Sequence, residues 1–122
     1  MTKQIELYKG RGRTRVAFSA NNIGNEVIVT IYNANAHIGA VALADYDLES
    51  GRTSTSVITR LGHKDDIVAQ KTAYKLTKNI KKASCVIAGI HIDAITHAEM
   101  EKILNNVDDL STKFIKGELK HE

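Results

Sequence analysis

The sequence contains no proline and no tryptophan, and only one of its 122 residues is a cysteine. Without proline, the chain holds no proline-rich linker, polyproline ligand or collagen-like segment. One cysteine can form neither an internal disulfide nor a thiolate zinc site, which favours a cytoplasmic protein. Aromatic residues make up only 5% of the chain, so we expect a mainly aliphatic core.

Long hydrophobic runs are also absent. The longest, residues 38–44 and 85–90, are far too short to cross a bilayer, and residues 1–5 show no apolar stretch of a secretory signal. The net charge of +3 permits anionic partners without demanding nucleic acid. We therefore predict a protein that binds neither membranes nor nucleic acids.

The remaining composition is that of an ordinary globular protein, with 43% hydrophobic and 25% charged residues. The length is typical of one domain. We expect a single domain over residues 1–119, followed by a frayed tail over residues 120–122.

Alternation of apolar and polar residues predicts β-strands in the first half of the chain. The clearest strand is 26–32, with Val27, Val29 and Ile31 on one face and Ile28 and Tyr32 on the other. Further strands, turns and a hairpin-length loop are expected in this order: strands 5–7 and 14–19, turn 21–25, loop 33–37, strand 38–46, turn 47–52 and strand 53–59.

Periodicity changes to helical spacing after Gly62. A helix is expected over 65–80, followed by an apolar strand over 84–92 that should be central and covered on both faces. Thr96 and Glu99 have the spacing of a capping box and open a second helix, and a last short strand is expected over 114–119. This order predicts an α+β fold, an antiparallel or mixed sheet of β-hairpins with two helices on one face.

No catalytic signature is present in the sequence: there is no nucleophile elbow, Walker loop, dinucleotide fingerprint or HExxH motif. We therefore predict that the protein is not an enzyme and has no catalytic residues. A phosphate-dependent enzyme using His63 or His91 as acid and base is the least favoured alternative.

Three arginines, Arg11, Arg13 and Arg15, occupy alternate positions. In an extended segment they would project from the same face and form a cationic ridge suited to phosphate. An edge strand protected by charge against aggregation is an equally weighted alternative.

The segment Gly62-His63-Lys64 lies immediately before the first predicted helix, downstream of a hydroxyl-rich stretch that includes Ser54. A helix start offers free N–H groups to an anion, and glycine permits close approach. Taken alone, the segment is more simply a junction between a loop and a helix, because Asp65 and Asp66 partly cancel the positive field.

Histidines lie at the ends of predicted elements: His37, His63 and His91. Such ends often converge on a site in sheet proteins, although a histidine at the end of a strand is more often structural. Their spacing fixes no metal geometry, so no metal site is predicted. Cys85 is interpreted as a small core residue.

Three segments taken together resemble a known family. They are N-A-H-I-G-A-V-A at 35–42, G-H-K-D at 62–65 and A-G-I-H-I-D at 88–93. In this order and spacing they resemble the prenylated-flavin chaperones of the LpdD type, over nearly the whole chain. That family is associated with UbiD-type decarboxylases, which act on hydroxylated aromatic acids and use prenylated FMN made by a separate flavin prenyltransferase.

The resemblance implies a non-catalytic protein that holds prenylated FMN, or FMN more weakly, and assists its delivery to, or the maturation of, a UbiD-type decarboxylase. It also implies a fold similar to proteasome-assembly chaperones, a homodimer, and the flavin prenyltransferase as a further candidate partner. A homodimer is also suggested by strand 26–32, whose two apolar faces are too much for two helices to cover.

The resemblance suggests a use for the residues singled out above. The phosphate would lie on the three arginines and the helix start, and the ring would lie near the strand-end histidines, so that the expected cofactor-binding residues are Arg11, Arg13, Arg15, His37, Gly39, Ser54, Gly62, His63, Lys64 and His91. The competing interpretation is a small accessory subunit that binds the decarboxylase without touching the cofactor. A nucleic-acid-binding module is disfavoured, because the chain lacks an aromatic platform for single strands.

Overall fold

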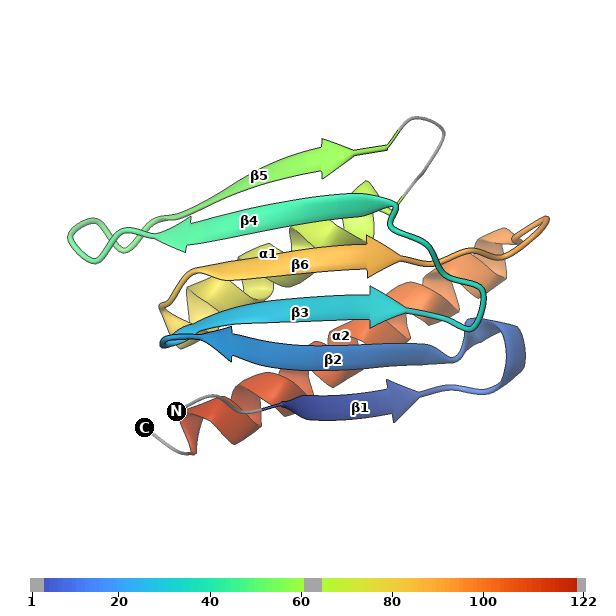
Figure 1. The fold of residues 1–122 in the computed structure, drawn as a ribbon, viewed down its shortest axis with the longest axis horizontal. Coiled ribbons are helices and arrows are strands. Elements are labelled where there is room, and N and C mark those ends of the chain that lie inside the picture. Colours follow the sequence, from blue (N-terminus) through green and yellow to red (C-terminus); the bar gives the residue numbers. More distant parts are fainter. Residues whose placement is uncertain (1–3, 61–64, 121–122) are drawn as a thin grey trace.

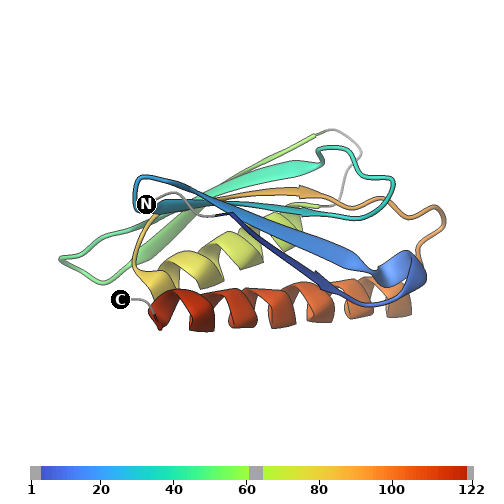
Figure 2. The same cartoon turned by 60° about the horizontal axis from the view of Figure 1, so that its bottom comes forward.

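A computed structural model gives the arrangement of residues 4–60 and 65–120. In this part of the chain, six strands form one sheet, and two helices pack against one of its faces (Figures 1 and 2). The strands are β1 (Ile5–Lys9), β2 (Val16–Ile23), β3 (Glu26–Tyr32), β4 (Ala40–Tyr46), β5 (Thr53–Thr59) and β6 (Ser84–Gly89). The helices are α1 (Asp66–Ile80) and α2 (His97–Leu119), with a short 3-10 turn, η1 (Gly12–Thr14), between β1 and β2. The predicted α+β class is confirmed.

The strand order is β1-β2-β3-β6-β4-β5. Neighbouring strands are antiparallel except β3 and β6, which are parallel. Strands β3 and β4 therefore do not form the hairpin that the short loop after Tyr32 suggests, because β6 lies between them. The most continuously apolar strand, β6, pairs with β3 along one edge and with β4 along the other. Where the loop after β3 joins β4, Gly39 N–H donates to the Ala88 carbonyl oxygen of β6 at 2.9 Å.

The core lies between the sheet and the two helices and is mainly aliphatic, as expected. Its largest fully buried side chains come from both layers: Phe18, Ile31, Leu76 and Ile103, with Val16, Val29 and Val86. The two phenylalanines of the chain contact each other across the layers, with ring centroids of Phe18 and Phe114 5.6 Å apart.

Helix α2 begins with the predicted capping box: Thr96 Oγ1 accepts from Glu99 N–H at 3.1 Å, and Thr96 N–H donates to the Glu99 carboxylate at 3.0 Å. The strand predicted over 114–119 is wrong, because these residues continue α2. Phe114 and Ile115 are buried at helical spacing from Leu110, so the apolar stripe runs on without a change of period. Of the tail expected to fray, residues 121–122 lie outside the described residues.

Strand β2 starts later and runs further than expected. Thr14 belongs to η1, and Asn21 and Asn22 pair with Ile28 and Val27 in the ladder instead of turning. The turn is confined to Gly24 and Asn25. Gly24 supplies it with a left-handed backbone, at φ +61°.

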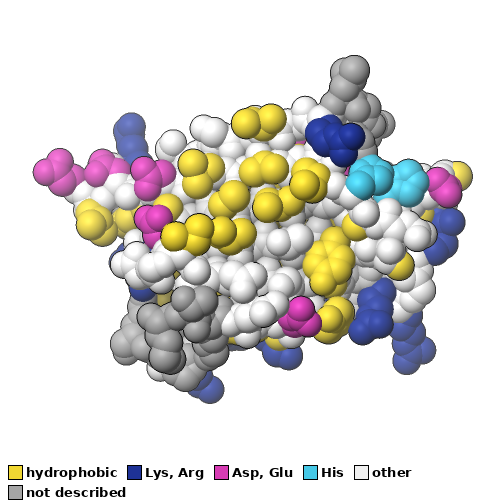
Figure 3. All heavy atoms as spheres, in the orientation of Figure 1, with side chains coloured by type: hydrophobic (Ala, Val, Ile, Leu, Met, Phe, Trp, Pro, Cys, Tyr) yellow, Lys and Arg dark blue, Asp and Glu magenta, His cyan; other side chains and the backbone are white. Residues whose placement is uncertain are grey.

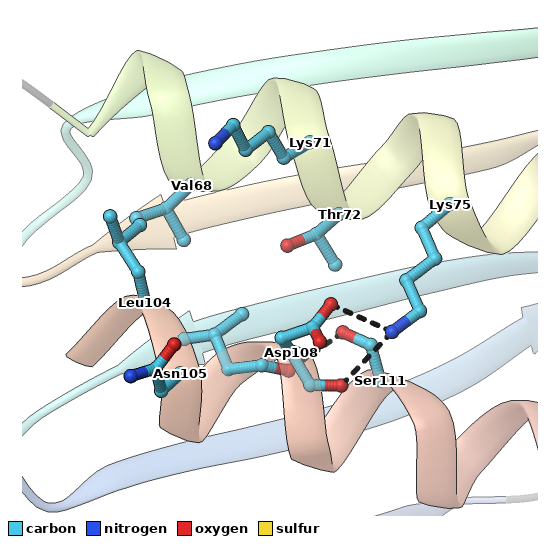
Figure 4. Close-up of a pocket in the computed structure, with 9 residues that line it drawn as sticks. Val68, Lys71, Thr72, Lys75, Leu104, Asn105, Asp108 and Ser111 are labelled. Carbon is cyan, nitrogen blue, oxygen red and sulfur yellow. Dashed lines mark hydrogen bonds and ion pairs between the residues drawn. The ribbon is translucent and has the colours of Figure 1, made fainter. Parts of the chain in front are cut away.

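A groove of about 190 Å³ separates α1 from α2 (Figure 4). Lys75 Nζ spans the two helices, donating to the Asp108 carboxylate at 2.7 Å and to Thr112 Oγ1 at 2.7 Å. This contact joins the two helices across the groove.

No helix or strand of the described residues packs on the second face of the sheet, and we refer to it as the open face. Apolar side chains gather over its middle (Figure 3) and form the apolar patch: Ile28, Val41, Leu43, Ile58, Cys85 and Ile87. Strand β6 is central, as predicted, but in this chain only one of its faces is covered. Cys85 is consequently a partly buried residue of the open face, where this burial raises the pKa of its thiol, and not a core residue.

No helix in the described ranges is both long enough and apolar enough to span a membrane.

Candidate functional site

One end of the sheet gathers the loops that follow β3 and β6, the η1 turn and the starts of β4 and α1 (Figure 1). We call it the loop end. The first and third of the sequence segments that resemble the flavin chaperones, residues 35–42 and 88–93, meet here with Asp65, the last residue of the second segment. Of the second segment, Gly62, His63 and Lys64 lie outside the described residues, so their expected role at the helix start stays a prediction.

Close backbone approach explains two glycines at the loop end. A Cβ at Gly39 would lie 1.7 Å from Asp65 Oδ2, and a Cβ at Gly89 would lie 2.3 Å from the His37 carbonyl oxygen. Asp65 is buried, and its Oδ1 accepts from Ile90 N–H at 3.3 Å. Gly39 is thus a packing residue, with the space beside it filled by Asp65. The sequence indicated only that this aspartate partly cancels the positive field at the helix start, and gave no sign of its contact with Gly39.

The structure brings two of the predicted histidines together. The ring centroids of His37 and His91 are 5.4 Å apart, and His91 Nε2 lies 2.9 Å from Asp93 Oδ1. The Asn33 side chain holds the backbone of His91 through both its groups, donating to the carbonyl at 2.8 Å and accepting from the N–H at 3.1 Å. The described residues contain no group of three side chains suited to a metal ion.

The three arginines do not form the expected ridge. The segment is not extended but turns at η1, because Gly10 and Gly12 take positive φ angles of 100° and 57°. Arg13 donates to the Glu99 carboxylate at 2.8 Å and to the Asp93 carbonyl at 2.7 Å, so its charge is compensated within the chain. Arg15 instead lies over the ring of Tyr8, with 4.9 Å between the guanidinium carbon and the ring centroid.

The contact of Arg13 with Glu99 makes stability depend on pH. The Arg13 hydrogen bond, followed by the bond to the Thr96 backbone, lowers the pKa of the Glu99 carboxyl. A lowered folded-state pKa gives stability that is complete above the unfolded pKa, about 4.3, and is lost as the pH falls through the folded value.

We therefore expect acidification from about pH 5 to pH 2 to destabilise the native protein more than the Glu99→Gln variant. Glutamine keeps the capping geometry but cannot titrate, so it is a matched control. Urea unfolding at several pH values measures the difference. Parallel pH profiles for the two proteins would show that this ion pair contributes nothing.

A hollow of the loop end lies on the open face. It has a volume of about 620 Å³ and is lined by Tyr8, Gly12, Arg15, Ala17, Tyr32, Asn33, Ala34 and Ala36. We call it the tyrosine hollow. Tyr8 pairs with Ala17 and Ala17 with Tyr32, so a small residue separates two aromatic ones across three strands.

A second hollow adjoins the first and shares Gly12, Asn33 and Ala34 with it. It has a volume of about 390 Å³ and reaches Arg13, His91 and Asp93, and we call it the histidine pocket. Figure 3 shows the histidine side chains beside the open face at this end of the sheet. The two hollows together offer a cationic and aromatic surface at the loop end.

Ser54 does not reach this surface. It is an exposed residue of β5 and pairs with Asp45, near the end of β4 opposite to Gly39. Its expected place in a cofactor site rested on its position upstream of the helix start, but β5 runs the full length of the sheet between the two.

Tyr8 and Tyr32 line the candidate site but are not among the residues that the sequence predicts for it. The first strand was expected to end at Leu7, and Tyr32 was considered only as part of an apolar face. The signal lies in the register that aligns both tyrosines with Ala17, which the sequence does not display.

Comparisons with known proteins agree with this architecture. A family model described as the prenylated flavin chaperone LpdD-like domain matches residues 10–118. Among solved structures, a chain from a chaperone complex for yeast 20S proteasome assembly superposes with a TM-score of 0.67 and 12% sequence identity. The match covers 97% of this chain and 98% of that chain, and at this identity it shows the fold alone. No curated protein is significantly similar in sequence.

Proposed function

Because the chain belongs to the LpdD-like family of prenylated-flavin chaperone domains, we propose that it binds prenylated FMN, and FMN more weakly, without turning it over. The protein holds the cofactor for delivery to, or maturation of, a UbiD-type decarboxylase. The flavin prenyltransferase that makes the cofactor is the corresponding donor.

The observation that supports cofactor binding is the pair of adjoining hollows at the loop end. The larger, at about 620 Å³, lies within the range of roughly 300–1,000 Å³ that small-molecule sites occupy. Its residues fit the chemistry of a flavin nucleotide, since arginine suits a phosphate and tyrosine suits a flat aromatic ring. Prenylated FMN, when bound, supplies the chemistry of the decarboxylase, while this chain binds and positions it.

The charges at the loop end also suit an anion. Glu99 compensates Arg13, whereas Arg11 and Arg15 form no ion pair with any carboxylate of the described residues. An exposed guanidinium without a carboxylate partner can bind a phosphate by donating charge-assisted hydrogen bonds to its oxygens. The helix start at Gly62–Lys64 stays a further candidate for the phosphate.

We also propose that the protein is a homodimer in which a second copy covers the apolar patch. The patch residues are uncharged, and Leu43 and Ile58 are 56% and 77% exposed in the single chain. An exposed apolar patch of this kind is typical of a protein interface. The decarboxylase is the alternative occupant, and in that case the protein acts as an accessory subunit.

Titration with reduced prenylated FMN under anaerobic conditions tests the function. Flavin fluorescence or calorimetry monitors the titration. We expect binding that saturates, with a dissociation constant at or below tens of micromolar, and recovery of the cofactor unchanged. Oxidised FMN should bind more weakly. If the protein activates the decarboxylase but binds no cofactor in this range, the accessory-subunit interpretation replaces the proposal.

A further inference from the structure

We infer that the tyrosine hollow is the seat of the flavin ring, between Tyr8 and Tyr32 above Ala17, and that Arg15 binds the phosphate. This inference rests on the proposed function and assigns its site. It differs from the expectation that the ring lies beside His37, Gly39 and His91, because Gly39 is buried against Asp65.

The spacing of the strands suits a flat ring. Tyr8 and Tyr32 stand on the same face of the sheet, two strands apart in one row through Ala17. Adjacent strands are about 4.8 Å apart, so the two tyrosine backbones are separated by about 9–10 Å. Stacked aromatic rings have centroids about 4.5–7 Å apart. A ring held between two tyrosines makes two such contacts, so the tyrosines must be about twice that distance apart, which is close to the separation of their backbones. Because the residue between them is an alanine, its small side chain leaves the space between the two tyrosines unfilled.

Tyr8 is already positioned as one wall of the hollow. Its hydroxyl donates to Glu6 Oε2 at 3.1 Å, and the Arg15 guanidinium lies over its ring at 4.9 Å. Arg15 is exposed, and its contact with Tyr8 is a cation–π interaction near solvent, which is weaker than a charge-assisted hydrogen bond to phosphate. On binding, Arg15 exchanges the tyrosine ring for the phosphate and opens the hollow to the flavin.

The loop after β3 closes the hollow on the side of Tyr32. Ala34 and Ala36 line it with small side chains, while the bonds of Asn33 to the His91 backbone hold the start of the loop in place. The wall beside Tyr32 is therefore held by the loop that follows β6 and does not depend on the ligand.

Titration of four variants with FMN and with riboflavin, which lacks the phosphate, tests the assignment. Tyr32→Ala removes one wall, and Tyr74→Ala is its control, because Tyr74 is an exposed tyrosine of α1. Arg15→Gln removes the cation, and Arg52→Gln is its control, in the turn between β4 and β5. The chain contains no tryptophan, so quenching of flavin fluorescence on binding reports stacking on tyrosine without interference.

We expect Tyr32→Ala to weaken binding of FMN and of riboflavin by about tenfold each, with most of the quenching lost. Arg15→Gln should weaken FMN binding by about tenfold and leave riboflavin binding unchanged. The two controls should bind like the native chain. Thermal unfolding followed by circular dichroism verifies that all variants are folded.

The outcomes separate the inference from the function. If the native chain binds neither FMN nor reduced prenylated FMN, the proposed function fails, and the site with it. If the native chain binds and Tyr32→Ala binds equally well, the ring lies elsewhere and only the inference is overturned. If Arg15→Gln loses equal affinity for FMN and for riboflavin, Arg15 does not bind the phosphate, and this part of the inference is overturned. If FMN does not saturate, the same four variants are titrated anaerobically with prenylated FMN.

Discussion

Replacing Gly89 with alanine should lower the free energy of unfolding by about 3 kcal/mol, the upper part of the usual range for overpacking a filled site. The added Cβ would lie 2.3 Å from the His37 carbonyl oxygen and 2.9 Å from its carbon, which are backbone atoms and not the end of a flexible side chain. Gly89 is not among the residues with positive φ, so the penalty comes from the clash and not from backbone strain. Urea unfolding measures the effect.

Gly117→Ala is the matched control for this substitution. Gly117 lies inside α2 and a Cβ there would meet no heavy atom within 4 Å. Alanine in an open helical position should raise the free energy of unfolding by about 0.5–1 kcal/mol, because glycine is a poor helix former. The same substitution is thus expected to have opposite signs at the two positions. Native-like stability of Gly89→Ala would mean that the loop after β3 does not rest on β6.

Elements with a clear periodicity could be predicted from the sequence almost to the residue. The strands Glu26–Tyr32 and Thr53–Thr59 have the predicted bounds, and α1 starts one residue after the expected position. In each of these elements one face packs on the core and the other does not. The spacing of apolar residues along the sequence therefore predicts the type and the bounds of the element directly. The capping box of α2 is equally local, because both hydrogen bonds join Thr96 to Glu99.

The arrangement of the strands could not be predicted in the same way. The sequence places β6 after α1, but in the sheet this strand lies between β3 and β4, which are joined by a short loop. Pairing between distant segments depends on which edges are left open once all strands are formed, and no local pattern encodes it. The tyrosine hollow depends on that pairing, because Tyr8 and Tyr32 align only through Ala17 of β2.

The arginine segment shows how a correct pattern can lead to the wrong geometry. Alternate positions share a face only in an extended chain. Gly10 and Gly12 permit left-handed backbone angles, and the chain turns between them and the start of β2. The turn sends Arg13 toward Glu99 of α2 and Arg15 over Tyr8 of β1, so the two cations acquire different partners.

The substitution Leu43→Asp should convert the proposed homodimer to a monomer. Leu43 belongs to the apolar patch and is 56% exposed in the single chain, so the substitution should leave the fold of the monomer intact. In a dimer that buries the patch, each copy would place an unpaired carboxylate in the interface. Burying a carboxylate without a partner costs about 3–5 kcal/mol, equivalent to a 10²–10³-fold weaker dimer or more.

Leu48→Asp is the control, because Leu48 is 82% exposed in the turn after β4 and lies outside the patch. Light scattering coupled to size exclusion, at micromolar protein, should give a dimer mass for the native chain and for Leu48→Asp and a monomer mass for Leu43→Asp. If the native chain is monomeric under these conditions, the homodimer is overturned, and the decarboxylase becomes the proposed occupant of the patch. A Leu43→Asp variant that remains dimeric would place the contact between copies on a different surface, because two aspartates facing each other in a dry interface have no partner to offset their desolvation.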